Sequence, residues 1–433
     1  MRSDNIASFR KVLNLPKNSY LLHAADIISA PNRSQFFKSD KKGMRTHTHA
    51  SRSLPIASKE DVVVLSAPLN KSYYNWLRSV GLSTDNIYTY NLKSTFKSLA
   101  EIIIENPAPV KKLLASLPGK AVYFPFYASK EDKTAAEDVL NIEFYGNEES
   151  IALKYFDKST FKDICVELEI PVVEGNIHKI NSTCNLNREE LAIIVKSLLK
   201  DYQKLIIRGT VGSAGRSLFT TETQHIKKIY KELLKNNDQQ VLIEPLLNVI
   251  SSPNDQWVID LKGQYRHLSL TAQLFQGLKH AGNISGQYYS KRIKEFIYSI
   301  SEKIVSQMAQ VGYRGVLGID YIVSEQGIFP IENNARVNGS TYVHALLEQI
   351  EKQVGKIECW KFYKARTKPI SFNNLKNLIS ELIYDGRRIN SVFPFDCDLL
   401  EKTGEMTVII FAEDVYHIDY LQDILSLKGI IRK

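Results

Sequence analysis

Two acidic residues on one predicted β-hairpin constrain this chain more than any other feature of its sequence. Residues 315–342 read GVLGIDYIVSEQGIFPIENNARVNGSTY, which predicts a strand, a tight turn and a second strand. A three-residue turn, Glu325–Gly327 with its glycine in a left-handed conformation, places Asp320 opposite Glu332 on the same face. Like charges directly opposite each other destabilise a hairpin. A hard cation bound between the two carboxylates would make the pairing favourable.

The polar residues that follow extend the same face. Asn334 and Arg336 continue the period of two from Glu332, so they are expected to project from that face as well. Two acids, an amide and a guanidinium suit the binding of a magnesium–polyphosphate complex. The alternative is an ordinary surface hairpin with scattered solvated charges. The same turn sets two further pairs opposite each other: Ile322 with Pro330, and Ser324 with Ile328.

The length and charge of the chain suit such a site. Its 433 residues predict two to four domains, and a hydrophobic content of 44% is enough for cores without disulfide bonds. The net charge of +9 comes without a basic stripe interleaved with aromatic residues. We therefore expect an electropositive cleft for anionic substrates and no nucleic-acid partner.

Cysteine use and hydropathy indicate a cytoplasmic protein. Cys165, Cys184, Cys359 and Cys397 form no CxxC pair and have no zinc spacing, as is usual in a reducing cytosol. The sequence shows no leader of charged and then apolar residues, and no apolar run of bilayer length. We expect no membrane partner.

Strands and helices alternate between residues 61 and 148, which predicts a small parallel sheet. The expected strands are Asp61–Ser66, Asn86–Tyr90, Ala121–Tyr127 and Ile142–Tyr145. No GxGxxG motif follows the first of them, so nothing indicates a dinucleotide site. The preceding residues are harder to interpret, because Tyr20–Ile28 suits either a helix or a strand and residues 31–53 suit a polar loop.

The loop over residues 31–53 carries histidines and arginines. His47 and His49 have no third metal ligand spaced nearby, so a polar loop is the simpler interpretation. Arg33, Arg45 and Arg52 could reach a ligand carboxylate from this loop.

A glycine-rich stretch joins two strands in the middle of the chain. Lys204–Arg208 predicts a strand, glycines follow at 209, 212 and 215, and Ser217–Thr221 predicts the next strand. Phosphate loops of the Walker and Rossmann kinds lead into a helix instead. Here the backbone N–H groups of a hairpin tip could close over phosphates, and a plain mobile hairpin is the alternative.

Further elements flank this hairpin. A helix begins at the capping residue Asp157, and the strand Val241–Leu247, VLIEPLL, carries one buried-looking acid, Glu244. From about residue 360 a smaller unit follows, with a helix near Leu375–Tyr384 and a strand over Met406–Ala412. That unit shows no catalytic constellation.

The order of these features resembles the ATP-grasp superfamily, in the arrangement shared by biotin carboxylase and D-alanine–D-alanine ligase. The resemblance is most specific at RGTVGSAG and ENNAR and covers residues 60–345 in layout. It implies an α/β (α+β) fold with a Rossmann-like pre-ATP-grasp domain over residues 1–148, two α+β lobes over 149–245 and 246–358, and a small α+β unit over 359–433. The chain is most similar to stand-alone carboxylate–amine ligases of the pheganomycin peptide-ligase type, which also carry Arg-Gly before the glycine loop.

The resemblance also implies which residues bind the nucleotide. Lys158, with Lys154 as a rival for its role, would contact the phosphates together with Arg208, which stands where most of the superfamily has a lysine. The loop residues over the β- and γ-phosphates would be Gly209, Gly212, Ser213, Ala214 and Gly215. The adenine-binding residues would be Glu244, with its side chain, and Leu246 and Leu247, with their backbone.

The metal and catalytic roles follow from the hairpin in the same way. Asp320, Glu332 and Asn334 would hold two Mg²⁺ ions, for which Mn²⁺ could substitute. Arg336, together with Arg208, would stabilise the transferred phosphoryl group or an acyl phosphate.

The activity implied by the resemblance is ATP-dependent formation of an amide or peptide bond, with an acyl-phosphate intermediate and release of ADP and phosphate. The expected substrates are small-molecule carboxylates and amines, such as amino acids or small peptides of secondary metabolism; a homodimer stays open. The alternatives are a kinase that phosphorylates a hydroxyl group and a regulatory nucleotide-binding module without turnover. The polar candidates for the substrate pocket are Gln273, His280, Asn283, Asn338 and Ser340.

Overall fold

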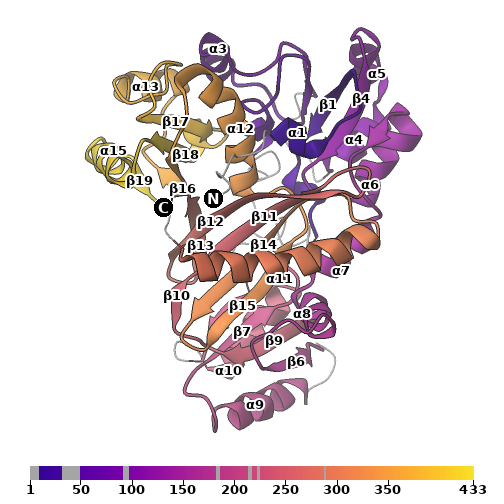
Figure 1. Ribbon diagram of the computed structural model, residues 1–433, viewed down its shortest axis with the longest axis vertical. Coiled ribbons are helices and arrows are strands. Elements are labelled where there is room, and N and C mark those ends of the chain that lie inside the picture. Colours follow the sequence, from indigo (N-terminus) through magenta and orange to yellow (C-terminus); the bar gives the residue numbers. More distant parts are fainter. Residues whose placement is uncertain are drawn as a thin grey trace.

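Three β-sheets organise the part of the chain that the structure describes. The computed structural model describes residues 9–31, 49–90, 97–181, 186–212, 217–221, 225–286 and 289–433. A parallel sheet lies near the N-terminus, a small antiparallel sheet lies at the opposite end of the molecule, and a large antiparallel sheet lies between them (Figure 1). No helix in these ranges combines the length and the apolar character needed to cross a bilayer.

The N-terminal sheet is parallel, as the alternation of strands and helices predicts. Its five strands have the order β3-β2-β1-β4-β5. Every residue of β2, VVVL, is buried, which is typical of a strand covered on both faces. The ambiguous stretch before residue 28 supplies the central strand, β1. The strands are β1 Ser19–Ala24, β2 Val62–Leu65, β3 Ile87–Thr89, β4 Lys120–Pro125 and β5 Glu143–Phe144.

Short helices cover this sheet on both faces. The segment 108–115, which the sequence analysis did not assign, forms one of them, α5. The helices are α1 Phe9–Leu13, η1 Ile27–Ser29, η2 Ala50–Ser53, α3 Lys71–Ser79, α4 Leu99–Glu105, α5 Ala108–Ala115, α6 Lys130–Thr134 and η3 Ala135–Leu140.

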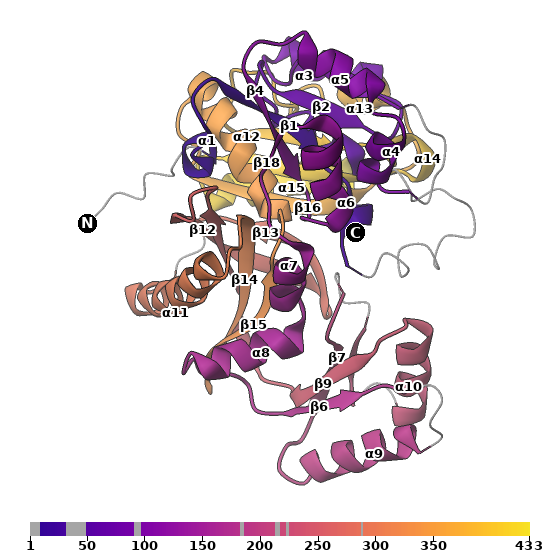
Figure 2. The same cartoon turned by 90° about the vertical axis from the view of Figure 1, so that its right-hand side faces the viewer.

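The small sheet, which we call the N-lobe sheet, has its own hydrophobic core. Its strand order is β6-β9-β7-β8, and helices α9 and α10 pack on it (Figure 2). Its buried residues form a cluster separate from the two other hydrophobic clusters of the described residues. The elements from the linking helices onward are α7 Glu149–Phe156, α8 Lys158–Glu167, β6 Asn176–Lys179, α9 Asn187–Leu198, β7 Leu205–Gly209, β8 Leu218–Thr220, α10 Ile226–Lys235 and β9 Gln240–Pro245.

The large sheet is continuous from the hairpin over residues 315–334, which we call the metal hairpin after its predicted role, into the C-terminal unit. Its order is β10-β14-β11-β12-β13-β16-β18-β17, with β15 paired to β14 and β19 paired to β16. The joint is the pair β13–β16, where a Cβ at Gly282 would lie 2.0 Å from the backbone oxygen of Phe362. The strands are β10 Val249–Ser251, β11 Pro253–Ile259, β12 Tyr265–Gln276, β13 Lys279–Ile284, β14 Gly315–Ser324, β15 Gly327–Asn334, β16 Cys359–Arg366, β17 Ser391–Asp396, β18 Glu405–Ala412 and β19 Ile431–Arg432.

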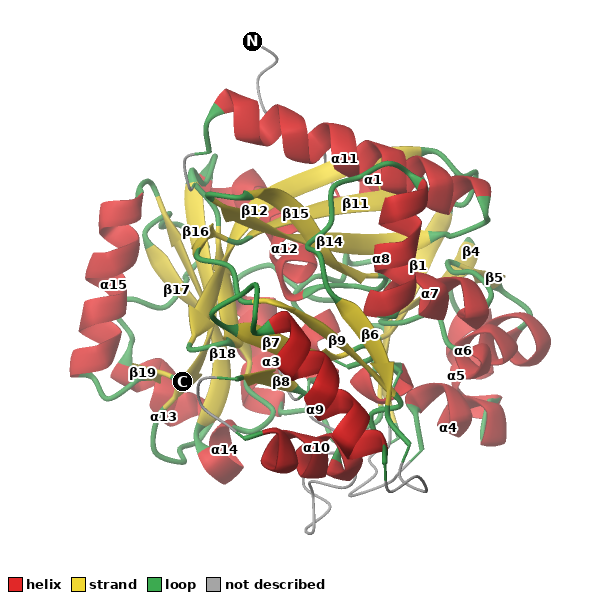
Figure 3. Ribbon diagram, turned by 90° about the horizontal axis from the view of Figure 1, so that it is seen from below, coloured by secondary structure: helices red, strands yellow, loops and turns green. Residues whose placement is uncertain are grey.

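Helices cover the large sheet along its length. Helix α11 crosses the strands next to the metal hairpin, and α15 lies at the C-terminal end of the sheet (Figure 3). One hydrophobic cluster joins the large sheet, the C-terminal unit and one face of the N-terminal sheet. The helices are α11 Lys291–Gln310, α12 Gly339–Val354, α13 Phe372–Leu378, α14 Leu400–Thr403 and α15 Val415–Leu427.

The register of the metal hairpin differs from the prediction next to the turn. Ser324 pairs with Gly327 and Ile322 with Phe329, so the predicted partners Ile328 and Pro330 are wrong. The loop contains two residues, and an extra residue in β15, between the partners of Asp320 and Tyr321, forms a β-bulge. The bulge shifts the register back, which is why the predicted pairing of Asp320 with Glu332 is confirmed.

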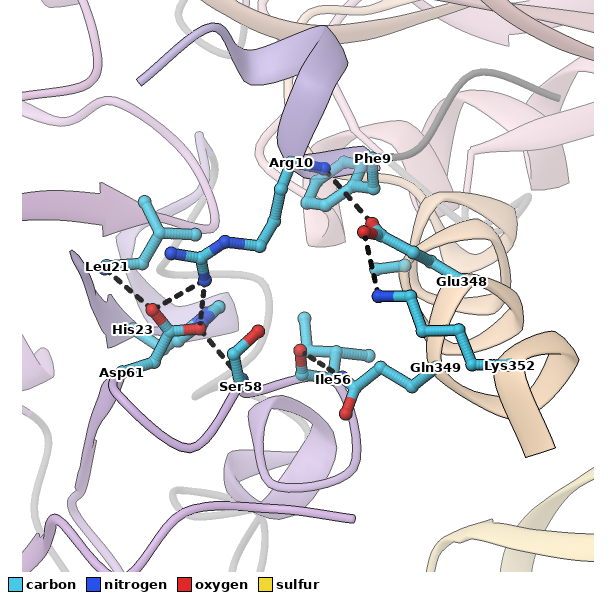
Figure 4. A pocket seen from close by; sticks show the side chains of 11 residues that line it. Phe9, Arg10, Leu21, His23, Ile56, Ser58, Asp61, Glu348, Gln349 and Lys352 are labelled. Atoms are coloured by element: carbon cyan, nitrogen blue, oxygen red, sulfur yellow. Dashed lines mark hydrogen bonds and ion pairs between the residues drawn. The ribbon is translucent and has the colours of Figure 1, made fainter. Parts of the chain in front are cut away.

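A buried carboxylate, Asp61, ties the N-terminal sheet to helix α1. It accepts hydrogen bonds from the backbone N–H groups of Leu21 and Ser58 at 2.8 Å and from Nη1 of Arg10 at 2.7 Å. These groups line a small pocket against helix α12 (Figure 4). Burial alone would raise the pKa of Asp61, but the hydrogen bonds and charges of His23 and Arg10 outweigh it and lower this pKa to about 2.

Candidate active site

Asp320 on β14 and Glu332 on β15 stand opposite each other on the large sheet. The side-chain amides of Asn254 and Asn334 donate to Oδ1 and Oδ2 of Asp320 at 2.6 and 3.0 Å. Oε1 of Glu332 lies 3.1 Å from Nζ of Lys158. Burial, together with the negative charge of Glu332, raises the pKa of Asp320 to about 7. The pair therefore has the like-charge repulsion that a bound cation would remove.

The donor set at this pair fits a hard divalent cation. Mg²⁺ binds in proteins through one or two carboxylates and completes its shell with water and substrate phosphates. Among the described residues, no group of three or more His, Cys, Asp or Glu side chains is arranged to hold a metal ion. Oδ1 of Asn334 accepts a hydrogen bond from Nη2 of Arg336 at 2.7 Å and keeps a second lone pair for a metal ion.

Lys158 lies between the glycine hairpin and the acid pair. Asp157 caps helix α8 by accepting from the N–H groups of Ser159 and Thr160 at 2.9 and 3.0 Å, which starts the helix at Lys158. Nζ of Lys158 donates to the backbone oxygen of Gly212 at 3.3 Å. Its rival Lys154 is exposed on α7. The geometry therefore brings Lys158, and not Lys154, to the carboxylates.

A buried ion-pair cluster of Arg208, Glu244 and Lys162 stands near Lys158. Nη2 of Arg208 donates to Oε2 of Glu244, and Nζ of Lys162 lies 2.8 Å from Oε1 of the same carboxylate. Burial would raise the pKa of Glu244, but the charges of Arg208 and Lys162 hold it below its usual value. Nη1 of Arg208 donates to the backbone oxygen of Ile331 at 3.3 Å, which links the N-lobe sheet to β15.

The third guanidinium nitrogen of Arg208, Nε, differs from the two that form these hydrogen bonds. This Nε is buried and has no hydrogen-bond partner among the residues that the structure describes. Buried polar atoms are nearly always hydrogen-bonded, so an orphaned donor on a cation indicates a missing acceptor. A phosphate oxygen would be such an acceptor.

The glycine hairpin begins where the chain packs too closely for a side chain. A Cβ at Gly209 would lie 2.3 Å from Oδ1 of Asp238 and 2.8 Å from Cβ of Ser217. The N–H of Gly209 donates to the backbone oxygen of Ser217 at 2.8 Å, which continues the β7–β8 ladder. The predicted phosphate contacts Ser213, Ala214 and Gly215 lie outside the described residues.

The predicted adenine-binding residues lie at the connection between the N-lobe sheet and the large sheet. The N–H of Leu246 donates to the backbone oxygen of Lys204 at 2.9 Å, so it is not available to a nucleotide base. The Glu244 carboxylate is held by the two cations of the buried cluster. The carbonyl of Leu246 and the backbone of Leu247 stay compatible with the predicted role.

Arg336 is held at the end of β15 by its own neighbours. Its Nη1 donates to the backbone oxygen of Val337 at 3.0 Å, and its Nη2 donates to Asn334. The guanidinium lies over the rings of Phe126 and Phe156, with its carbon 5.4 and 6.0 Å from their centres. Phe126 follows β4, so the N-terminal part of the chain forms one wall of the site.

The structure adds functional candidates that the sequence analysis missed. Lys162 follows Lys158 by one helical turn and so shares its face, a signal that the sequence contains. Asn254 and Gln256 lie on β11, which begins at Pro253, four residues before the predicted strand at Trp257. With the correct start, their period of two places both on the face of Asp320.

The polar candidates for the substrate pocket form hydrogen bonds around this face. Nε2 of His280 lies 2.9 Å from Oδ1 of Asn283, whose Nδ2 donates to Thr271 at 3.1 Å. Ser340 bonds to Gln256 and lies 3.4 Å from Oδ1 of Asn254. Gly318 leaves room for the side chain of Asn338, because a Cβ at position 318 would lie 2.8 Å from Nδ2 of Asn338.

Comparison with solved structures confirms the predicted fold class. No protein-family model and no curated protein sequence matches this chain. The biotin carboxylase of Campylobacter jejuni, solved as an ATP-analogue complex, is 13% identical over 96% of this chain and 91% of its own, with a TM-score of 0.57. The biotin carboxylase domain of the Hydrogenobacter thermophilus 2-oxoglutarate carboxylase, solved with MgADP and bicarbonate, is 12% identical over 95% and 90%, with a TM-score of 0.58. N5-carboxyaminoimidazole synthetase of Staphylococcus aureus, solved with ADP, is 9% identical over 95% and 97%, with a TM-score of 0.53. The shared architecture is the ATP-grasp fold.

Proposed function

We propose that this chain, which has the ATP-grasp fold, is an ATP-dependent ligase that joins a carboxylate to an amine through an acyl phosphate. The observation that carries the proposal is the convergence of Asp320, Glu332, Lys158 and Arg208 between the N-lobe sheet and the large sheet. Structures of this fold are solved with ATP analogues, ADP and magnesium. Their nucleotides support ATP and Mg²⁺ as the cofactors of this chain.

In the proposed phosphoryl transfer, the residues of the site have different roles. Asp320 and Glu332 would hold Mg²⁺, which neutralises charge on the phosphates when bound. Lys158 and the orphaned donor of Arg208 would hold the phosphates in line with the acceptor. Arg336 would stabilise the phosphoryl group as it moves.

The proposed reaction has two steps, formation of the acyl phosphate and attack by the amine. A carboxylate oxygen attacks the γ-phosphorus, the bond to the β-phosphate oxygen breaks, and ADP leaves. The amine nitrogen attacks the acyl carbon, loses a proton, and the carbon–oxygen bond to phosphate breaks. The acyl phosphate hydrolyses easily, so exclusion of water by the glycine hairpin would protect it.

The finer assignment, to peptide ligases of the pheganomycin type acting on amino acids or small peptides in secondary metabolism, belongs to the same proposal. It rests on the Arg208–Gly209 pair before the glycine loop and on the α/β domain that precedes the lobes.

Hydroxylamine provides the test of this function. A ligase should release ADP and phosphate in equal amounts with a carboxylate substrate, and hydroxylamine should trap the acyl phosphate as a hydroxamate. The measurement is phosphate release and hydroxamate formation over a panel of amino acids and short peptides. Phosphate retained on a product would instead indicate a kinase. Nucleotide binding without turnover on the panel would indicate a regulatory module.

Arg208→Ala should weaken the binding of MgADP by about tenfold to a hundredfold, because a charge-assisted hydrogen bond contributes about 1.5–3 kcal/mol. Calorimetric titration of the protein measures this change. Arg188→Ala is the matched control, because Arg188 is exposed on α9 of the same lobe and, among the described residues, pairs with its neighbour Glu189. Unchanged affinity in Arg208→Ala would move the phosphate role to Lys162.

A further inference from the structure

Arg52 lies close to the proposed active site although it belongs to the N-terminal part of the chain. It is on η2, and its guanidinium carbon lies 6.0 Å from the centre of the Tyr342 ring. Tyr342 is on helix α12, which begins shortly after Arg336. Burial raises the pKa of Tyr342 to about 12, while the charges of Arg52 and Arg336 both oppose this shift. The two arginines therefore lie near the same ring.

The C-terminal unit holds Arg52 in place. Asp396, at the end of β17, accepts a hydrogen bond from Nε of Arg52 at 2.9 Å. The same carboxylate oxygen bonds to Nδ1 of His49. The side chain of Arg52 is only 12% exposed, so its position is set by the protein and not by solvent.

Most of the hydrogen-bonding capacity of Arg52 is unused. A guanidinium group has five N–H donors in a planar fork. Toward the residues that the structure describes, the Arg52 side chain donates only from Nε, and Nη1 and Nη2 make no hydrogen bond. A largely buried guanidinium whose Nη1 and Nη2 make no hydrogen bond to the described residues can bind a planar anion, such as a carboxylate, through these two nitrogens.

Lys364 on β16 adds a second cation. It pairs across the sheet with Thr407 on β18, which pairs in turn with Asp396 on β17, the partner of Arg52. Within the described ranges Lys364 forms no ion pair. Its side chain is exposed, and desolvation by the protein atoms around it lowers its pKa. The charge of Arg52 lowers this pKa further, and the charges of Lys364 and Arg336 both act on His280.

Negative groups also lie near these cations. Asp396 is shared between Arg52 and His49. Asp398 lies 3.2 Å from the backbone nitrogen of Ser51, and burial and the charge of Asp396 raise its pKa to about 7. Glu332 and Asp320 oppose the charge of Arg336, and Asp396 and Glu405 oppose that of Lys364. What favours an anionic ligand here is the set of unused donors on Arg52.

We propose that Arg52 and Lys364 form a second anion site beside Arg336, which binds a free carboxylate carried by a substrate of the ligation. This inference rests on the proposed function and narrows its substrates to acids or amines with an additional carboxylate. The carboxylate comes either from a second carboxyl group of the acid substrate or from the α-carboxylate of an amino acid that supplies the amine. In both cases Arg336 faces the reacting carboxylate and Arg52 faces the one that does not react.

The experiment compares free carboxylates with their carboxamides on the full-length protein. Phosphate release is measured with amino acids and dipeptides, each as the free carboxylate and as the carboxamide. Each compound is tested first as the acid substrate and then as the amine substrate, which shows which of the two substrates carries the recognised carboxylate. Calorimetry in the presence of MgADP measures the binding of succinate and glutarate and of their diamides. The variants are Arg52→Gln and Lys364→Gln, with Lys402→Gln, exposed on α14, as the matched control.

The wild type should prefer the free carboxylate at least tenfold. Arg52→Gln should raise the KM for that substrate about tenfold, with kcat changed less than twofold and carboxamide substrates unaffected. Lys364→Gln should act in the same direction and keeps the test valid if Arg52→Gln does not fold. The anion site would be overturned if the wild type showed neither a preference for free carboxylates nor binding of dicarboxylates. It would also be overturned if both properties were the same in the wild type and in the two variants. Arg52-dependent dicarboxylate binding without phosphate release on any substrate would leave the anion site standing and overturn the ligase function.

Discussion

Replacing Glu332 with glutamine is expected to lower ATP turnover by about 10³-fold, the size of effect seen when one preorganised charge partner is lost at a reaction centre. Glu332 is one of two carboxylates that would hold Mg²⁺, and it also pairs with Lys158 at 3.1 Å. Glutamine has the same shape and removes the charge, so the fold should persist. Phosphate release at saturating ATP and MgCl₂ measures the loss.

A second readout separates metal binding from catalysis. At about 100 times its Kd, a ligand that binds only the folded protein stabilises it by about 2.7 kcal/mol. MgADP should raise the melting temperature of the wild type, and this rise should be largely lost in Glu332→Gln. The control is Glu325→Gln, at the exposed turn of the same hairpin. Near-native turnover in Glu332→Gln would show that the metal assignment is wrong.

Asp61→Asn should lower the free energy of unfolding of the N-terminal part by about 3 kcal/mol at pH 7, because it leaves the buried side of Arg10 without its counter-ion. The change is expected to appear as a lower urea midpoint in tryptophan fluorescence. One of the three tryptophans, Trp76, is buried on α3 in the same part of the chain. Asp85→Asn is the control, because Asp85 pairs with Arg78 at the surface.

The pH dependence of this stabilisation has a definite sign. The folded pKa of Asp61 is lowered from 3.8 to about 2, so its contribution is complete above pH 4–5 and is lost as the pH falls toward 2. The shift corresponds to about 2 kcal/mol. The difference between wild type and Asp61→Asn should therefore shrink between pH 5 and pH 2. A difference that stays constant over this range would contradict the role of the charge.

Local patterns in the sequence predicted the centre of the site. The opposition of Asp320 and Glu332 depends on a short hairpin, in which turn residues and alternation constrain the register. Even so, the loop was predicted with three residues and has two, and the bulge beyond it was not predicted. The shorter loop and the bulge shift the register in opposite directions, so the two offsets cancel at Asp320.

The surroundings of the site depend on contacts between distant segments. Arg208 and Glu244 meet because β7 and β9 are antiparallel neighbours, which no local pattern states. Arg52 and Asp396 are separated by 344 positions in the sequence. The edge strand β17 contains Pro394, a residue that argues against a strand unless the strand lies at a sheet edge. For the C-terminal unit the sequence showed no catalytic constellation, and the contact of its Asp396 with Arg52 was not predicted.

The unbroken large sheet sets which distances in this protein can change. Because β13 pairs with β16, the strands that carry Asp320 and Glu332 and the strands that carry Lys364 and Asp396 form one continuous platform. The N-lobe sheet has a separate core, so it can swing as a unit without repacking that platform. In the proposed ligase, closure of the N-lobe sheet would bring the phosphates to a substrate held on this platform. The distance between the proposed metal site and the proposed anion site would then limit the length of the substrate, and the movement of the lobe would affect only when the reaction begins.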